Sequence, residues 1–191
     1  MNWKAVPIPE RMQALPKDAR GYPIPHNIWR DTQGVAHFTI NDHVKAEACL
    51  RENRCPICGD ALEKTSWLCG GPLSALHPAG AYIDQPTHSE CVHYAIRVCP
   101  YLAAPKYTKR LDTSGVDPNH ANGMLFVDPT VIPDRPPVFV LIEPRAFTIT
   151  LKNRHYLPQR PYLHTEFWLK GREITLRQAT LVDPRIEVLI Q

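Results

Sequence analysis

The sequence has little glycine and no long apolar stretch. Nine of its 191 residues are glycine, whereas twenty are proline, roughly twice the usual share. Because proline interrupts helices and interior strands, we expect short elements joined by extended segments. The densest apolar run, Val138–Ile142, has five residues and is too short to cross a membrane. The opening residues Met1–Pro7 lack the apolar core of a secretory signal, so we expect no membrane association and a cytoplasmic protein.

A strong excess of one charge is also lacking. The 22 basic and 19 acidic residues give a net charge of +3, which does not by itself imply a nucleic-acid partner. Hydrophobic residues at 43% and charged residues at 21% are typical of a globular protein and exclude a wholly disordered chain. In a reducing compartment, the six cysteines indicate metal ligation, catalysis or buried thiols rather than disulfides.

Two of the cysteines, Cys55 and Cys58, are separated by two residues and followed by Gly59. This spacing is that of a zinc knuckle, in which two thiolates turn toward one ion and the glycine takes a positive φ. Further along, His88 and Cys91 stand three apart in the first turn of an expected helix, so they point the same way. The sequence therefore predicts a zinc ion bound by Cys55, Cys58, His88 and Cys91.

The segments beside these ligands predict their surroundings. Thr87 followed three positions later by Glu90 has the pattern of a capping box, which places a helix directly after it. A hairpin between residues 67–69 and 81–83, followed by that helix, would give the arrangement of a treble-clef zinc finger. Cys69, His77 and His93 are alternatives to His88 as a ligand.

A catalytic zinc ion is the less favoured interpretation. His88-Ser89-Glu90 matches the first half of a zinc deaminase signature, but here the cysteine pair comes before it rather than after it. Three cysteines and a histidine also leave no coordination position for water, so we expect structural zinc. A metal-dependent nuclease of the His-Asn-His type, with His77 and His93 in its active site, is the alternative enzyme.

The remaining pattern predicts an α+β fold in which short helices and antiparallel hairpins surround the treble-clef zinc site. We expect a helix capped by Asn41 or Asp42 and ending before Asn53, with Val44, Ala48 and Cys49 facing inward. Val138–Ile142 has the composition of a strand buried on both faces. Other strands are expected at 28–30, 35–40, 147–151, 164–169 and 173–176.

One composite domain over residues 1–191 accounts for these patterns, because no repeat or polar linker divides the chain. Within it we expect an extended proline-rich arm at 1–27, a zinc-bearing module at 28–105 and a β-rich part at 106–191.

Several motifs together resemble a family of small uncharacterised proteins found in bacteria and their phages. They are Gly21–Pro25, Phe38–Asp42, Cys55–Cys58, Gly71–Leu73 and Pro86–Leu102, with a weaker likeness at Phe167–Arg172. The resemblance covers about residues 20 to 110; the chain departs from it at Pro56, where the family carries an aromatic residue, and between His77 and Gln85. It implies the same zinc ligand set and a phage-related origin, which would place the protein in the host cytoplasm. It implies no activity.

Two stretches contain basic and aromatic side chains without any acid, from Cys91 to Leu111 and from Pro144 to Thr165. If they lie together, their cations could follow a phosphate backbone while the tyrosines stack on bases. The candidate nucleic-acid residues are Lys106, Lys109, Arg110, Lys152, Arg154 and Arg160. We therefore expect a zinc-stabilised binding module for nucleic acid, rather than an enzyme. The alternatives are a phage effector that binds a host protein, and the nuclease.

Overall fold

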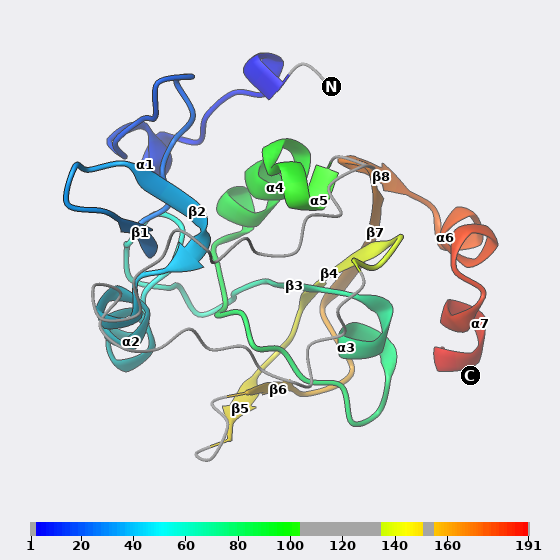
Figure 1. Cartoon of the computed structure of the whole chain (residues 1–191). Helices are drawn as coiled ribbons and strands as arrows, with labels where there is room; N and C mark the ends of the chain where they lie inside the picture. Colours follow the sequence, from blue (N-terminus) through cyan, green and yellow to red (C-terminus); the bar gives the residue numbers. More distant parts are fainter. Residues whose placement is uncertain (1–2, 104–134, 151–154, 191) are drawn as a thin grey trace. The chain divides into compact units, whose positions relative to one another are not determined.

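The computed structural model of the chain describes residues 3–103, 135–150 and 155–190 (Figure 1). These residues form short helices and antiparallel sheets, which confirms the predicted α+β class. They divide into two compact units, one made of residues 8–61 and 135 and the other of residues 3–7, 62–103, 136–150 and 155–190. One composite domain over 1–191 stays a prediction, because contact density alone does not define which parts fold independently.

The centre of the larger unit is a four-stranded antiparallel sheet. Its order is β3 (Leu68–Gly70), β4 (Phe139–Glu143), β7 (His164–Leu169) and β8 (Arg172–Ile174). Across β4 and β7, Phe139 pairs with Trp168 and Leu141 with Glu166, so these side chains share one face of the sheet. Every residue of β4 is buried, which confirms the prediction of a strand covered on both faces.

Helices cover both faces of this sheet (Figure 1). On one face, α4 (Ser89–Val98) packs Val92 and Ile96 against Phe139, Leu141 and Trp168 to form the main apolar core. The short helix α5 (Pro100–Ala103) follows it. On the other face lie α3 (Pro72–Leu76), α6 (Leu176–Val182) and α7 (Arg185–Leu189).

Three further elements complete the larger unit. They are the 3-10 helix η1 (Trp3–Ala5) and the two-stranded ribbon of β5 (Phe147–Ile149) and β6 (Tyr156–Pro158).

The smaller unit is built from α1 (Glu10–Gln13), the ribbon of β1 (Ile28–Arg30) and β2 (Ala36–Asn41), and α2 (His43–Glu52). As predicted, the Asp42 carboxylate accepts a hydrogen bond from Lys45 N and caps α2, and Asn53 ends it in the left-handed region at φ 51°. Cys49 is 1% exposed, but the inward orientation predicted for Val44 is wrong, since this side chain is 60% exposed. The two residues are five apart, so they point about 140° away from each other around the helix.

Two predictions about the larger unit need correction. No hairpin forms between 67–69 and 81–83: β3 pairs with β4, Trp67 bridges to Thr87, and Tyr82 bridges to Tyr156. The pairing of β3 with β4 is favoured over the hairpin, because it makes β3 part of a four-stranded sheet. A two-stranded hairpin alone is only marginally stable. The part after residue 135 is rich in strands, as expected, but β6 and the helices α6 and α7 were not predicted.

Candidate metal centre

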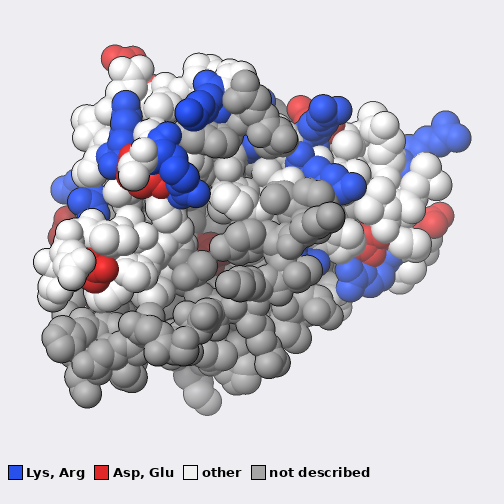
Figure 2. All heavy atoms as spheres, turned by 45° about the horizontal axis from the view of Figure 1, so that its top comes forward, with Lys and Arg blue, Asp and Glu red and all other residues white. Residues whose placement is uncertain are grey.

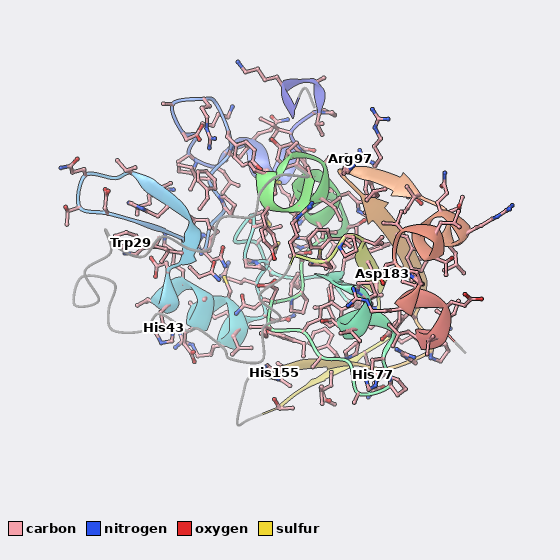
Figure 3. The ribbon with its side chains drawn as sticks, turned by 45° about the vertical axis from the view of Figure 1, so that its right-hand side comes forward. Trp29, His43, His77, Arg97, His155 and Asp183 are labelled. Atoms are coloured by element: carbon pink, nitrogen blue, oxygen red, sulfur yellow. The ribbon has the colours of Figure 1, made fainter. Side chains whose placement is uncertain are left out.

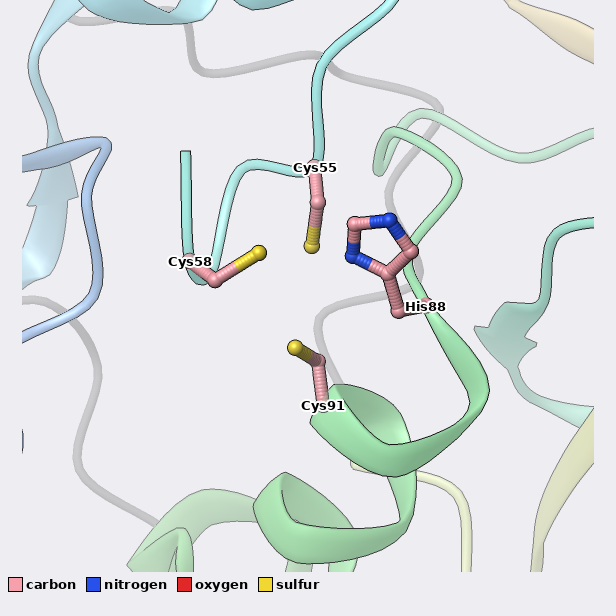
Figure 4. Close-up of side chains that lie close together, drawn as sticks. All are labelled: Cys55, Cys58, His88 and Cys91. Carbon is pink, nitrogen blue, oxygen red and sulfur yellow. The ribbon is translucent and has the colours of Figure 1, made fainter. Parts of the chain in front are cut away.

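Four buried side chains meet at one point of the structure (Figure 4). They are the predicted ligands Cys55, Cys58, His88 and Cys91, whose donor atoms all lie within 4.8 Å of one another. Each of the four is at most 8% exposed. In the described part of the chain, no other group of histidine, cysteine and acidic residues meets the same criterion for holding a metal ion.

The first two ligands sit on a tight turn. The backbone N–H of Gly59 donates to the Cys55 carbonyl at 2.8 Å, and Cys55 N–H donates to the Asp60 carbonyl at 2.8 Å. These bonds fold the segment back on itself and bring Cys55 and Cys58 together. Gly59 has φ +87°, so the glycine predicted for this position is required by the backbone conformation.

The side of the turn at Gly59 is covered by His26. A Cβ added to Gly59 would stand 2.8 Å from His26 Nδ1, so an imidazole ring occupies the space that any larger residue would need. The backbone N–H of His26 also donates to the Ile57 carbonyl at 2.8 Å, inside the turn. Burial lowers the pKa of His26, and the nearby positive charges of Lys45 and Arg54 lower it further. The neutral ring is therefore favoured at this position.

The other two ligands stand where α4 begins. His88 is the N-cap residue and Cys91 lies in the first turn, so the helix starts at Ser89, one residue later than a cap at Thr87 would place it. The capping box predicted from Thr87 and Glu90 is wrong, because the N-cap residue is His88 and its side chain makes no capping hydrogen bond. Thr87 instead pairs with Trp67: two backbone hydrogen bonds of 2.8 and 2.9 Å join them, and the Thr87 hydroxyl donates to the Trp67 carbonyl. This bridge holds the chain directly before His88 against the segment entering β3.

The donor set fits a tetrahedral metal ion. Ligands about 2.3 Å from a tetrahedral ion lie roughly 3.8 Å apart, so the observed separations need a closure of about 1 Å at most. Three sulfurs and one imidazole nitrogen make four protein ligands, which is a full tetrahedral set. The first turn of a helix also favours thiolate over thiol, because its unpaired N–H groups carry a positive partial charge. The arrangement can hold a metal ion without any ligand from solvent.

The remaining cysteines lie outside this group, and none of the six forms a disulfide. Cys49 is close enough to Cys55 for their charges to interact, but burial raises the pKa of the Cys49 thiol and so keeps it protonated. Burial also raises the pKa of Cys69, which packs against the core beside α4. Cys99 ends α4 and is half-buried. These thiols have the environment of packing residues, as predicted for Cys49 and Cys99.

The two histidines considered as alternative ligands have other partners. The backbone N–H of Ala79 donates to His77 Nδ1 at 3.1 Å. His93 Nδ1 lies 2.6 Å from the Ser89 carbonyl, and its Nε2 lies 2.9 Å from Glu166 Oε2. Glu166 Oε2 accepts a second hydrogen bond from the indole N–H of Trp168. His93 therefore joins α4 to β7 and is not part of the metal-binding group.

Most of the predicted nucleic-acid residues lie outside the described part of the chain, namely Lys106, Lys109, Arg110, Lys152 and Arg154. Arg160 is described, and its guanidinium donates to the carbonyls of Ala75 and His77, each at 3.0 Å. These bonds hold the end of α3. On the face shown in Figure 2, the described Lys and Arg side chains stand in separate groups, several of them beside acidic residues.

Comparison of the chain with protein-family models, curated proteins and solved structures gives no match. The resemblance to a phage-related family therefore stays a prediction. Among the described residues, no helix is both long enough and apolar enough to span a membrane.

Proposed function

We propose that this chain is a zinc-stabilised binding module rather than an enzyme. The proposal rests on one observation: three cysteines and one histidine, all buried, bring their donor atoms within 4.8 Å of one another. Thiolate and imidazole together are the ligands that zinc prefers in closed, four-coordinate structural sites.

Three features support a structural rather than a catalytic ion. A site with four protein ligands leaves no position for the water that a hydrolytic zinc ion activates. Glu90, the candidate proton carrier of a deaminase, is exposed at the surface of α4. His93, required as an active-site histidine by the nuclease alternative, directs its two ring nitrogens at Ser89 and Glu166 instead.

The structural function of the ion follows from where its ligands stand. His88 and Cys91 are at the start of α4, and the next residues of that helix, Val92 and Ile96, form the core on the central sheet. An ion held at the first turn would fix the position of a helix whose amino terminus has no side-chain cap. The same ion would tie that turn to the Cys55–Cys58 segment.

Metal content tests this proposal directly. Protein purified without chelator should contain one zinc ion per chain by plasma mass spectrometry. Replacement of zinc by Co²⁺ should give the visible absorption of a tetrahedral, thiolate-rich site. Cys58→Ser should abolish that spectrum, whereas Cys99→Ser should leave it unchanged. Wild-type protein that neither contains nor takes up metal would contradict the proposal.

Nucleic acid is the partner class we propose for this module, on the strength of the two basic, acid-free stretches in the sequence. Binding through phosphate contacts weakens steeply as salt is added, so anisotropy titrations of labelled DNA and RNA at several salt concentrations test it. Lys109→Ala together with Arg154→Ala should weaken binding and reduce the salt dependence. If no oligonucleotide binds and one host protein is captured stoichiometrically, the module is instead a protein-binding effector.

A further inference from the structure

The chain directly before β1 lies against the turn that carries the first two predicted ligands. The backbone N–H of His26 donates to the Ile57 carbonyl at 2.8 Å. The next N–H, that of Asn27, donates to the Pro56 carbonyl at 3.0 Å. Pro56 and Ile57 are the two residues between the cysteines of the turn. Both carbonyls between these ligands are therefore held from outside the turn.

This part of the chain is itself fixed in place. Ile24 before it and Ile28 after it are 4% and 7% exposed, so the segment is anchored in the core of the smaller unit on both sides. The carbonyl of Asn27 also accepts a hydrogen bond from the backbone N–H of Asp42, at 2.7 Å, directly before α2. Ligands supported by a rigid outer layer keep their spacing without the ion, which lowers the cost of binding it.

The His26 ring stands on the least covered side of the metal-binding group. Cys58 is 8% exposed, whereas the other three residues of the group are at most 3% exposed. The ring packs against Gly59, the residue directly after Cys58. Burial lowers the pKa of His26 and a charge on Cys58 opposes this shift, so the ring lies within electrostatic range of that sulfur. In Figure 4 the N-terminal part of the chain, in blue, passes beside Cys58.

We propose that His26 is a positioning residue of the metal site, whose ring closes the side at Cys58 and slows the release of the ion. The inference rests on the proposed zinc site and concerns how that site is regulated. The shell around a metal site controls the access of solvent and of competing ligands. Because the other ligands are almost fully covered, a competing ligand has to approach past Cys58, where the ring must first move aside.

Release of zinc from the full chain to an excess of a chromogenic chelator tests this proposal. His26→Ala leaves space beside Gly59, so release should become at least about tenfold faster. His26→Phe keeps a ring in that space and should release zinc at nearly the wild-type rate. His26→Val removes part of the ring, and its rate should lie between those of wild type and His26→Ala. This variant also provides the comparison if His26→Ala does not fold.

His37→Ala is the matched control, because His37 is also a partly buried histidine of the smaller unit. Its ring centre lies 4.8 Å from that of Trp29, which is labelled in Figure 3, and its Nε2 lies 3.0 Å from Asp31 Oδ2. This variant should release zinc at the wild-type rate even where it is less stable. The Co²⁺ form of His26→Ala should keep the absorption spectrum of wild type, because all four ligands remain.

Three results would overturn the proposal. The first is release from His26→Ala, or from His26→Val in its place, at the wild-type rate. The second is an equal acceleration by His37→Ala, which would show that lower stability alone frees the ion. The third is fast release from His26→Phe, since a ring would then not be enough to close the site. Wild-type protein that holds no zinc would contradict the proposed function instead, so the two failures are distinguishable.

Discussion

Replacing Cys91 by serine should remove the metal and a large part of the stability of the fold. Structural zinc sites provide about 10–16 kcal/mol of apparent binding free energy, so loss of the ion costs at least the share of one of its four ligands, roughly 3–4 kcal/mol. Cys91 is 0% exposed, so the serine hydroxyl that replaces its thiol would be buried without a hydrogen-bond partner. This adds a further cost of about 1–3 kcal/mol. The total of about 4–7 kcal/mol is comparable with the whole stability of many domains.

Cys49→Ser is the matched control for this variant. Cys49 is 1% exposed and belongs to the same neighbourhood, but it is not among the four residues that meet. The free energy of unfolding of Cys49→Ser should fall only by the cost of burying the serine hydroxyl. The difference between the two variants isolates the metal, and at roughly 2–4 °C per kcal/mol it amounts to about 6–16 °C in melting temperature.

The assay is thermal unfolding followed by circular dichroism, with metal content measured on the same samples. Cys91→Ser should contain little zinc and melt well below Cys49→Ser, which should retain the ion. Excess chelator should lower the melting temperature of wild type and of Cys49→Ser but not that of Cys91→Ser. Equal melting temperatures for the two variants, or equal metal content, would refute the assignment of Cys91 as a ligand.

Three further predictions concern single residues. Gly59→Ala should destabilise the protein by at least about 1–2 kcal/mol in urea unfolding, since its φ of +87° disfavours any side chain; an unchanged midpoint would contradict this. Arg185 holds the pKa of Asp183 below its usual value, so the pair stabilises the fold above about pH 4 and loses this effect as the carboxylate is protonated. Asp183→Asn should therefore be less stable than wild type by about 1–3 kcal/mol at neutral pH, with the gap closing as the pH falls through the lowered pKa of Asp183; a gap independent of pH would refute the ion pair. Glu166→Ala removes the acceptor of the buried Trp168 indole N–H and should cost about 1–3 kcal/mol while metal content stays constant; loss of metal would show that Glu166 acts on the site.

The features that the sequence predicted well are decided by residues close together in the chain. The Asp42 cap of α2 needs only a carboxylate three residues before a backbone N–H, and Gly59 needs only the geometry of its own turn. The metal-binding group is also predicted from neighbouring residues, because its members form two pairs with a spacing of three residues. The first pair is Cys55 and Cys58, and the start of α4 positions the second pair, His88 and Cys91. Such patterns can be read without knowledge of the rest of the fold.

The errors concern partners that are distant in sequence. β3 pairs with β4, about 70 residues later, and nothing near residues 68–70 indicates that choice. Thr87 fits the pattern of a capping residue, yet its hydroxyl donates a hydrogen bond to the carbonyl of Trp67 instead. The helix α6 is different, because its capping box of Thr175 and Gln178 is visible in the sequence and could have predicted where the helix starts.

The order of the elements along the chain has a consequence for synthesis. All four metal-binding side chains lie between residues 55 and 91, whereas three of the four strands of the central sheet lie after residue 138. A ribosome therefore releases all four of these side chains before it has made the partner of β3. If these residues bind zinc as proposed, the ion would bind the nascent chain at that stage and close a loop of fewer than 40 residues, and the entropy cost of closing a loop grows only slowly with its length. The cellular zinc supply during translation, rather than after it, would then decide how much of this protein reaches its folded state.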